Sequence, residues 1–391
     1  MRLRAALIVA GMALAGCRPA GPAPERVAAG LPRAEPTVRV GVAVDAEQVR
    51  VSSAGALELA VPGDGAAVRL PAGSVLTVSA DADGRLRVRT ASGAGVGDGA
   101  AVVRIAPAGE DAVLVDGRPY RGEVLLRSVT PGRVSAINVL ELEEYLRGVV
   151  PLEIGARPAS EIEAVKAQAV AARTYAIGHM GRREALGFDF HATTADQVYG
   201  GLGREDPVAD RAVRETRGEI LVYDGQPILA YYHSTCGGRT AAIDEVWERA
   251  PLPYLKAVSD ATPEGGAYCE PSNRYRWEER WSGEELRRIL AQTLAGGATL
   301  GRIGRIRITQ RTPTGRVDTL RIEADGREHR VHGDSVRWVL RPAPDRILNS
   351  SLLLELEADE APDGVRQLRV RGGGWGHGIG MCQWGAIGRA R

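Results

Sequence analysis

Four short clusters in this sequence carry side chains that can do chemistry. The first runs from Glu153 to Arg173, and the others cover residues 196–201, 232–238 and 375–385. Together they offer a carboxyl group for acid–base catalysis, two cations for anion binding, and aromatic and amide groups that could hold a ligand. Each cluster alone also has an ordinary structural explanation, since Glu153 is one of 49 acidic residues.

The spacing of residues in the first and third clusters limits what they can do. Lys166 and Arg173 are seven residues apart on a predicted helix, so they share a face, which is usually a solvated face. His233 and Ser234 are neighbours on a predicted strand and point to opposite faces. They therefore cannot form a base–nucleophile pair.

The fourth cluster overlaps a glycine-rich run at residues 372–380. It contains no Gly-Lys-Ser/Thr and follows no βα unit, so a phosphate-binding loop is not expected. We expect the glycines to let the backbone approach a bulky ligand. Trp375, His377, Gln383 and Trp384 would then stack on that ligand and hydrogen-bond to it.

The elements that must position these clusters predict an α+β fold. Residues 38–119 alternate apolar and polar positions, as in Arg85–Arg89, and predict a small antiparallel β-domain. No aromatic residue precedes Tyr120, so this domain offers no stacking platform and is expected to be a spacer or scaffold. Residues 120–391 predict a second, mixed α+β domain with a central cleft.

Within the second domain, residues 140–154 predict a short helix that leads into a loop broken by proline. Residues 160–163 match a capping box that opens an alanine-rich helix ending near Met180. Residues 219–235 have strand patterning, and residues 284–295 predict another helix. Further strands are expected between residues 302 and 358.

The N-terminus has the pattern of an export signal. Residues 1–16 combine two arginines with an apolar stretch, and Leu-Ala-Gly-Cys at its end predicts lipidation of Cys17. A signal peptide with an incidental cysteine is the alternative. Residues 17–37 are rich in proline and alanine and predict a tether. We expect a membrane-anchored envelope lipoprotein; a formal charge of +1 gives no basic field for nucleic acid.

From about Tyr120 to its end, the chain resembles one family. The matching stretches, in order, are LEEYLRGVVPLE, AVKAQAVAARTYA, DQVYGG, YYHSTCGGRTAAIDEVW, PYLKAVSD, TGRVDTLRI and GGGWGHGIGMCQWGA. They resemble the sporulation stage II protein D / LytB amidase-enhancer family of peptidoglycan-acting proteins. The resemblance implies one of two roles: a lytic transglycosylase that cuts the MurNAc–GlcNAc bond and leaves a 1,6-anhydro sugar, or a non-catalytic enhancer of an N-acetylmuramoyl-L-alanine amidase.

The resemblance also implies roles for single residues. It puts the catalytic acid at Glu153 and a supporting cationic pair at Lys166 and Arg173. It implies that substrate would be bound by Gln197, Tyr199, Tyr232, His233, Ser234, Trp375, His377 and Gln383. Expected partners are glycan strands and a cell-wall amidase, in an envelope that faces the periplasm or cell wall, with an outer membrane as one destination.

The expected chemistry needs a single carboxyl group. Glu153 would protonate the glycosidic oxygen and then accept the proton of the sugar's own C6 hydroxyl. A carboxyl that is protonated near neutral pH needs a raised pKa, which burial among residues 149–154 could supply. Lys166 and Arg173 would lower that pKa, so they are expected to bind a substrate carboxylate or acetamido oxygen, or to position Glu153 indirectly.

Two departures from the family pattern stand out. Some members carry Cys and His ligands for zinc just before Gln-Val-Tyr, but residues 190–196 hold one His and no Cys, so no metal or cofactor is expected. The sequence also ends seven residues after Trp384, where members continue with a helix and a tail, so we expect either a truncated tail or a protein that lacks it.

Three cysteines besides Cys17 remain to be paired. An oxidising compartment favours one disulfide and one buried thiol among Cys236, Cys269 and Cys382. We favour Cys236–Cys269, with Cys236–Cys382 as the main competitor. A Cys/His metal site is the least favoured reading, because no CxxC spacing supports it.

Overall fold

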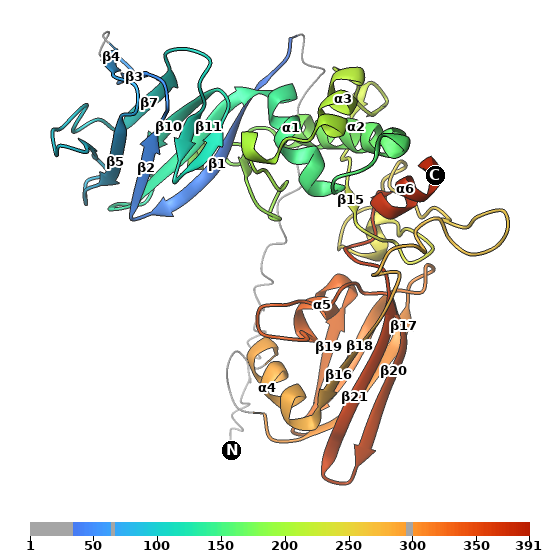
Figure 1. Ribbon diagram of the computed structural model, residues 1–391. Coiled ribbons are helices and arrows are strands. Elements are labelled where there is room, and N and C mark those ends of the chain that lie inside the picture. Colours follow the sequence, from blue (N-terminus) through green and yellow to red (C-terminus); the bar gives the residue numbers. More distant parts are fainter. Residues whose placement is uncertain (1–33, 64–66, 295–299) are drawn as a thin grey trace, which may run out of the picture.

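The computed structural model describes residues 34–63, 67–294 and 300–391, and its mixed helices and strands confirm the α+β fold (Figure 1). The predicted signal peptide, Cys17 and most of the predicted tether lie outside these ranges. Within them, no helix has the length and apolar character needed to cross a bilayer.

The N-terminal region consists of two sheets packed face to face. Their alternation follows the sequence, since Leu86 and Val88 are buried while Arg87 between them is exposed. In these two sheets, neighbouring strands run antiparallel, except that β12 pairs in parallel with β1. In sheet order, the larger sheet contains β12 (Phe190–His191), β1 (Thr37–Ala46), β11 (Val134–Glu141), β10 (Glu123–Arg127), β7 (Val102–Pro107), β3 (Leu57–Ala60) and β4 (Val68–Leu70). The smaller contains β6 (Leu86–Thr90), β5 (Val75–Ala80), β2 (Gln48–Ser52), β8 (Val113–Val115) and β9 (Arg118–Tyr120).

The packing continues across the domain boundary expected at residues 119 and 120. Strand β10 lies beyond that boundary and pairs with β7, while β11 pairs with β1. One hydrophobic core joins the two sheets to the helices that follow, from Val38 to Ile387. The N-terminal sheets therefore support the helices directly.

The helices α1 (Leu142–Glu153), α2 (Ile162–His179) and α3 (Pro207–Glu215) lie next to the larger sheet, and α6 (Gln383–Ala390) packs against α2 on the side away from it. Helix α1 passes through Pro151 and ends two residues later. Because the proline lies in the last turn, its missing N–H removes only one backbone hydrogen bond of the helix. The capping box expected at the start of α2 is wrong. Ser160 lies within a 3₁₀ turn (Ala159–Glu161), and no side chain caps the helix.

The segment at residues 219–235 forms less strand than its pattern predicts. It contains β13 (Val222–Tyr223), β14 (Gln226–Pro227) and β15 (Tyr232–His233), and β15 pairs in parallel with β22 (Met381–Cys382). The rest is irregular, because the segment turns at Asp224–Gly225 and then crosses to the last loop rather than joining a wide sheet. Further 3₁₀ turns are Glu184–Leu186, Leu202–Arg204, Ile243–Glu245 and Gly333–Ser335.

A separate C-terminal β-region has its own core around Trp281 and Leu368. Strands β17 to β20 confirm those expected between residues 302 and 358, and α4 confirms the expected helix, with a capping box from Ser282. Its two sheets contain β16 (Arg276–Ser282), β21 (Gly364–Gly373) and β20 (Leu353–Ala361), and β17 (Ile303–Arg311), β18 (Val317–Ala324) and β19 (Arg327–His332). Its helices are α4 (Gly283–Thr293) and α5 (Val336–Val339).

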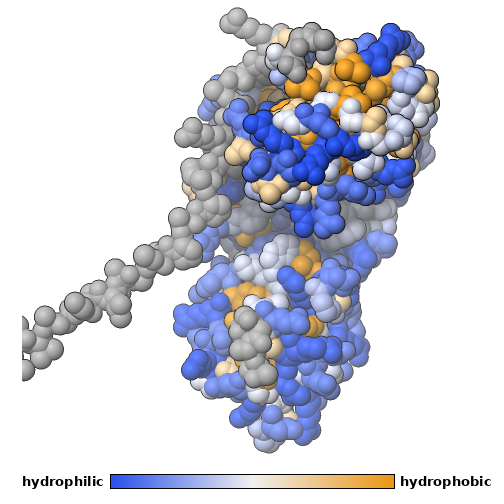
Figure 2. All heavy atoms as spheres, turned by 90° about the vertical axis from the view of Figure 1, so that its left-hand side faces the viewer, coloured by the Kyte–Doolittle hydropathy of each residue, from blue (hydrophilic) through white to orange (hydrophobic). Residues whose placement is uncertain are grey.

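The two β-regions differ in surface character. Figure 2 shows apolar residues gathered on the outward end of the N-terminal region, whereas the visible face of the C-terminal region is mostly hydrophilic. Val68 on β4 is one of the exposed apolar side chains. The chain enters the C-terminal region at Arg276 and leaves it at Gly373, which pair with each other. This region is therefore an insertion between the irregular segment that ends at Arg276 and the last loop, which begins after Gly373.

Candidate active site

A cleft of about 590 Å³ lies where the end of α1 meets β15 and the glycine-rich last loop. Of the predicted site residues, the structure brings seven together here: Glu153, Tyr232, His233, Ser234, Trp375, His377 and Gln383. Four others do not line this cleft: Lys166, Arg173, Gln197 and Tyr199. The seven come from parts of the chain separated by up to 230 positions, so only the fold makes them neighbours.

Glu153 is the last residue of α1, and its carboxyl group is largely withdrawn from solvent. Burial raises its pKa from 4.5 to about 7. Two hydrogen bonds act against that rise, one from the backbone N–H of Val198 at 2.7 Å and one from the Tyr232 hydroxyl. A carboxyl with this pKa can both donate and accept a proton near neutral pH.

Gln197 lies behind the cleft and orders its hydrogen bonds. Its amide nitrogen donates to the Tyr232 hydroxyl at 3.0 Å and to the carbonyl of Ala172, while its amide oxygen accepts from the Tyr145 hydroxyl. Because the Tyr232 oxygen accepts from Gln197, its own proton is directed to Glu153. Gln197 therefore positions Tyr232 and lies where it cannot contact a ligand in the cleft.

His233 and His377 are neutral at physiological pH. Burial lowers the pKa of His233 to about 3 and holds that of His377 well below its usual value. The Nδ1 of His233 donates to the carbonyl of Ile379 at 3.1 Å, and the Nδ1 of His377 accepts from the Ile379 N–H at 3.0 Å. The two rings are thus held by the backbone of one residue of the last loop, Ile379, and neither serves as a cation.

The glycines of the last loop make room for the chain itself, which differs from the expected approach to a ligand. Gly376 has φ 108°, and a Cβ there would lie 2.8 Å from the His233 Cβ. Gly380 has φ 72°, and its Cβ would lie 2.0 Å from the Tyr231 carbonyl oxygen. Any side chain at either position would therefore push the loop away from β15 and open the cleft.

Aromatic side chains form one wall of the cleft. Trp375 is 47% exposed and stands beside the Arg274 guanidinium, which lies 5.4 Å from its ring centre. Trp247 and Tyr231 also line the cleft and pack edge to face, but they were not among the predicted site residues. A signal for both was present, because they begin and end the stretch YYHSTCGGRTAAIDEVW.

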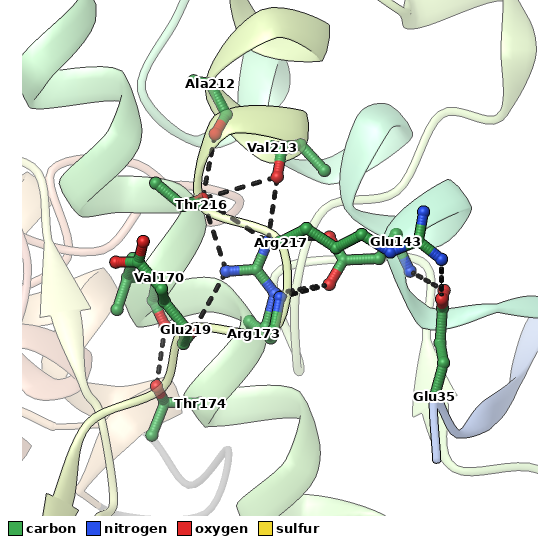
Figure 3. A network of polar contacts seen from close by, with 11 residues as sticks. Glu35, Glu143, Val170, Arg173, Thr174, Ala212, Val213, Thr216, Arg217 and Glu219 are labelled. Carbon is green, nitrogen blue, oxygen red and sulfur yellow. Dashed lines mark hydrogen bonds and ion pairs between the residues drawn. The ribbon is translucent and has the colours of Figure 1, made fainter.

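Arg173 lies in a buried network away from the cleft (Figure 3). Its guanidinium makes two parallel bonds to the Glu143 carboxylate, at 2.8 and 2.7 Å, and a third to the carbonyl of Glu219. Only 1% of its side chain is exposed. The same network continues through Glu35, whose carboxylate binds the backbone of Glu143 and the side chain of Arg217.

Lys166 also points away from Glu153. Its ammonium group pairs with Glu163 and Glu215, both at 2.9 Å, at the mouth of a different pocket. Lys166 and Arg173 do share a helix face, as their spacing predicts, and that face packs against the end of α3 and the residues after it. Neither cation of this pair lines the cleft that holds Glu153.

Tyr199 belongs to the core below the cleft. Its hydroxyl donates to Asn138 at 2.7 Å, and its ring packs against those of Tyr120 and Tyr145. A Cβ on Gly148 would lie 2.6 Å from this ring, so the glycine is required for the packing.

Asp196 is the other carboxyl group that lines the cleft among the described residues. Its Oδ2 accepts from the backbone N–H of His191 at 2.8 Å and pairs with Arg183 at 3.1 Å. Its Oδ1 has no hydrogen-bond partner in the described structure, and the absence of a metal from residues 190–196 stays a prediction from the sequence.

The three cysteines lie together near the cleft and are free thiols. The Sγ atoms of Cys236 and Cys269 are 3.6 Å apart, whereas a disulfide requires about 2.05 Å. The structure therefore brings the favoured pair together without a bond between them. Cys382 lies beside them and accepts a hydrogen bond from the Cys236 N–H.

Comparison with known proteins agrees with this arrangement. The model of the stage II sporulation protein family matches residues 130–223, which include α1, α2 and α3. The chain is 31% identical to stage II sporulation protein D of Bacillus subtilis over 267 residues, covering 64% of this chain and 69% of that protein. This chain belongs to the stage II sporulation protein D family.

This member of the stage II sporulation protein D family is also similar to two further proteins. An uncharacterized protein of Brachyspira hyodysenteriae is 33% identical over 283 residues, covering 72% of this chain and 70% of that protein. The amidase enhancer of Bacillus subtilis is 45% identical over 116 residues, which cover 29% of this chain and 15% of the enhancer. Residues 265–380 also match a domain family of unknown function, which spans the inserted C-terminal β-region.

Proposed function

We propose that this protein is a peptidoglycan lytic transglycosylase that cleaves the bond between MurNAc and GlcNAc with Glu153 as its acid and base. The observation that carries the proposal is the raised pKa of Glu153, about 7, in a cleft of about 590 Å³. Family membership supports the substrate class, and the exposed ring of Trp375 supports binding of sugar rings.

The proposed reaction needs one carboxyl group. Protonated Glu153 donates its proton to the glycosidic oxygen as the bond from that oxygen to C1 of MurNAc breaks. The resulting carboxylate accepts the proton of the MurNAc C6 hydroxyl, whose oxygen forms the new bond to C1. The products are a GlcNAc with a free hydroxyl and a 1,6-anhydro-MurNAc, and Glu153 returns to its protonated form.

The surrounding residues fit this cycle. Tyr232 donates to Glu153, so it stabilises the carboxylate in the middle of the reaction. Gln197 holds Tyr232 in that orientation. Asp196 is bound to Arg183, which disfavours it as a second catalytic carboxylate.

In this proposal Arg173 is a positioning residue and Lys166 stabilises the helix surface. Arg173 binds Glu143 in the first turn of α1, and Glu153 is the last residue of the same helix. Of the two roles open for the pair, indirect positioning of Glu153 therefore fits Arg173 better than contact with substrate.

Digestion of purified sacculi tests the proposal. Wild-type protein should release muropeptides with 1,6-anhydro ends, and Glu153→Gln should reduce the rate by about 10²- to 10⁴-fold. Tyr199→Phe is the matched control, because its hydroxyl binds Asn138 below the cleft. Products with a reducing end would indicate hydrolysis and a second carboxylate, and absence of any product from wild type would overturn the proposal.

A second candidate is a non-catalytic enhancer of a cell-wall amidase. The observation in its favour is the likeness to the amidase enhancer, at 45% identity over 116 residues. Adding the chain to a purified N-acetylmuramoyl-L-alanine amidase with sacculi separates the two candidates. Acceleration by both wild type and Glu153→Gln, without anhydro products, would favour the enhancer.

The same proposal places the protein in the cell envelope, anchored through lipidated Cys17. A Leu-Ala-Gly-Cys sequence after an apolar stretch supports this, and acyl chains on one cysteine would hold the folded region at a membrane. Labelling with a fatty-acid analogue should mark wild type and not Cys17→Ala, with fractionation following the label. Label on both would assign it to another site.

A further inference from the structure

Three cysteines and one aspartate that are distant in the sequence converge beside the cleft. Cys236 follows β15, Asp260 and Cys269 belong to the long irregular segment before β16, and Cys382 ends β22. All four side chains are at most 7% exposed. One ligand atom from each lies within 4.8 Å of the ligand atoms of the other three.

The distances in this cluster fit one tetrahedral metal ion. Zinc lies about 2.3 Å from sulfur and 2.0–2.2 Å from oxygen, so tetrahedral angles give about 3.8 Å between two sulfurs and about 3.5 Å between sulfur and oxygen. The Sγ atoms of Cys236 and Cys269 are 3.6 Å apart. The Sγ of Cys236 is 3.5 Å from the Asp260 Oδ2.

The backbone around the cluster is arranged for anionic sulfur. The N–H groups of Cys236 and Gly385 both point at the Cys382 Sγ, each at 3.2 Å. The N–H of Cys269 donates to the Asp260 Oδ2 at 2.9 Å. Such outer hydrogen bonds orient the ligands of metal sites and stabilise their charge.

Two arginines beside the cluster provide positive charge. The Oδ2 of Asp260 faces the cysteines, and its other carboxylate oxygen, Oδ1, pairs with Arg389. Arg316 is 1% exposed, donates to the Cys236 carbonyl at 3.4 Å, and has two N–H groups without a partner in the described structure. Three thiolates and one carboxylate carry more negative charge than one divalent ion neutralises. The two arginines can balance the remaining negative charge, and the buried Arg316 in turn gains a nearby anion.

Apolar packing directly around the cysteines is small, while the neighbouring part of the segment has its own apolar cluster around Ile243 and Leu255. The apolar cluster around the cysteines contains one other fully packed residue, Ala267, among the described side chains. Residues 235–275 have a single 3₁₀ turn and isolated bridges as regular structure within the described range. A bound ion can hold together a site whose own apolar core is this small.

We propose that Cys236, Asp260, Cys269 and Cys382 bind one Zn²⁺ ion that fixes the walls of the cleft. All four positions of the ion are filled by protein atoms, so the site is structural and offers no position for water or substrate. The ion joins the segment that follows Ser234 to the loop that precedes Gln383. Ser234 and Gln383 themselves line the cleft. This site is separate from the family stretch at residues 190–196, and its metal content does not depend on whether Glu153 cleaves glycan.

The metal content of the full chain is the first test. Protein produced with added zinc and purified without chelators should contain about one zinc per chain by elemental analysis. Cys269→Ser should lose most of this zinc, while Ala267→Ser, which adds a hydroxyl beside the cluster without removing a ligand, should keep it. Cobalt bound in place of zinc should show thiolate-to-metal charge-transfer absorption.

A chelator provides a second test that does not rely on the cysteine variant folding. Dipicolinate should lower the Tm of wild type and Ala267→Ser, and added zinc should restore it. Asp260→Asn keeps all three thiols and should bind zinc more weakly. The proposal would be overturned if the wild-type chain contained no zinc and its Tm did not change with the chelator. A Cys236–Cys269 disulfide mapped by mass spectrometry would also overturn it.

Discussion

The two ends of helix α1 carry glutamates in opposite situations. Glu143, in the first turn, is bound by both nitrogens of the Arg173 fork and by the Gly218 N–H. Glu153, the last residue, faces the cleft with a tyrosine and a backbone N–H as its partners. Burial raises the pKa of Glu153 to about 7 because these partners are neutral.

The comparison shows how one helix separates stability from chemistry. An acid that is buried with a matching cation stays charged and fastens the helix to its neighbours. An acid that is buried with neutral partners is costly to ionise, so it reduces stability at high pH and is ready to transfer a proton. The predictions below test whether the two ends differ in this way.

The largest expected effect follows from removing the cation at the first end. Arg173→Met should lower the free energy of unfolding by about 3–5 kcal/mol, because it leaves Glu143 without its charge partner. Urea unfolding measures the loss. Adding Glu143→Gln should restore part of it, and a loss below about 1 kcal/mol would contradict the assignment of a buried ion pair.

The second prediction concerns the opposite end and the sign of its pH dependence. The folded chain keeps its proton on Glu153 up to about pH 7, whereas the unfolded chain releases it near 4.5. Wild type should therefore lose stability relative to Glu153→Gln as pH rises from 4.5 to 7, by about 3 kcal/mol in all.

Unfolding curves at pH 4, 6 and 8 measure this difference. Glu153→Gln should be the more stable protein at pH 8 by this amount, relative to the two proteins at pH 4. Glu143→Gln is the control and should be less stable than wild type, since it weakens an ion pair. Parallel curves for wild type and Glu153→Gln would place the carboxyl of Glu153 in water.

A smaller effect is expected from the neutral partner of Glu153. The Tyr232 hydroxyl lowers the pKa of Glu153, so Tyr232→Phe should raise that pKa. If Glu153 is the acid, kcat/KM for glycan cleavage falls as it ionises, and in Tyr232→Phe this fall should move up by as much as about one pH unit. Tyr199→Phe should leave it in place, and an unmoved profile in Tyr232→Phe would remove this contact from the mechanism.

The smallest effect is expected for Lys166, which its family position suggests as a catalytic cation. Its ion pairs with Glu163 and Glu215 lie at the surface of α2, where such pairs contribute little. Lys166→Ala should change stability by less than about 1 kcal/mol and leave the cleavage rate unchanged. A large loss of rate with unchanged stability would return Lys166 to the catalytic site.

Local pattern was enough to predict most elements and part of the site. The alternation in residues 85–89 is that of a half-buried strand, and β6 has that burial. Glu153 and Tyr232 were found by likeness to a family, and both reach the cleft. Gln197 and Tyr199 were found in the same way but face the core, because a motif does not record which side of the backbone faces the ligand.

The partners of a charged side chain could not be predicted. Lys166 and Arg173 lie on one helix face, as their spacing indicates, but the sequence does not say what packs against that face. The fold places α3 and the start of α1 against that face. Lys166 therefore pairs with Glu215 of α3, and Arg173 pairs with Glu143 of α1. Glutamates are too numerous in this chain for their partners to be chosen from sequence.

The sequence by itself determined the periodicity of strands and helices, the family, and the carboxyl on which the proposed chemistry rests. Only the tertiary structure decided the environment of that carboxyl, the separation of Arg173 from it, and the convergence of Cys236, Cys269 and Cys382. Periodicity is set by neighbours a few residues apart, whereas pKa values and ligand clusters depend on atoms that meet only when distant segments pack. For that reason the cysteines, read as a disulfide and a spare thiol, become a candidate zinc site once the chain is folded.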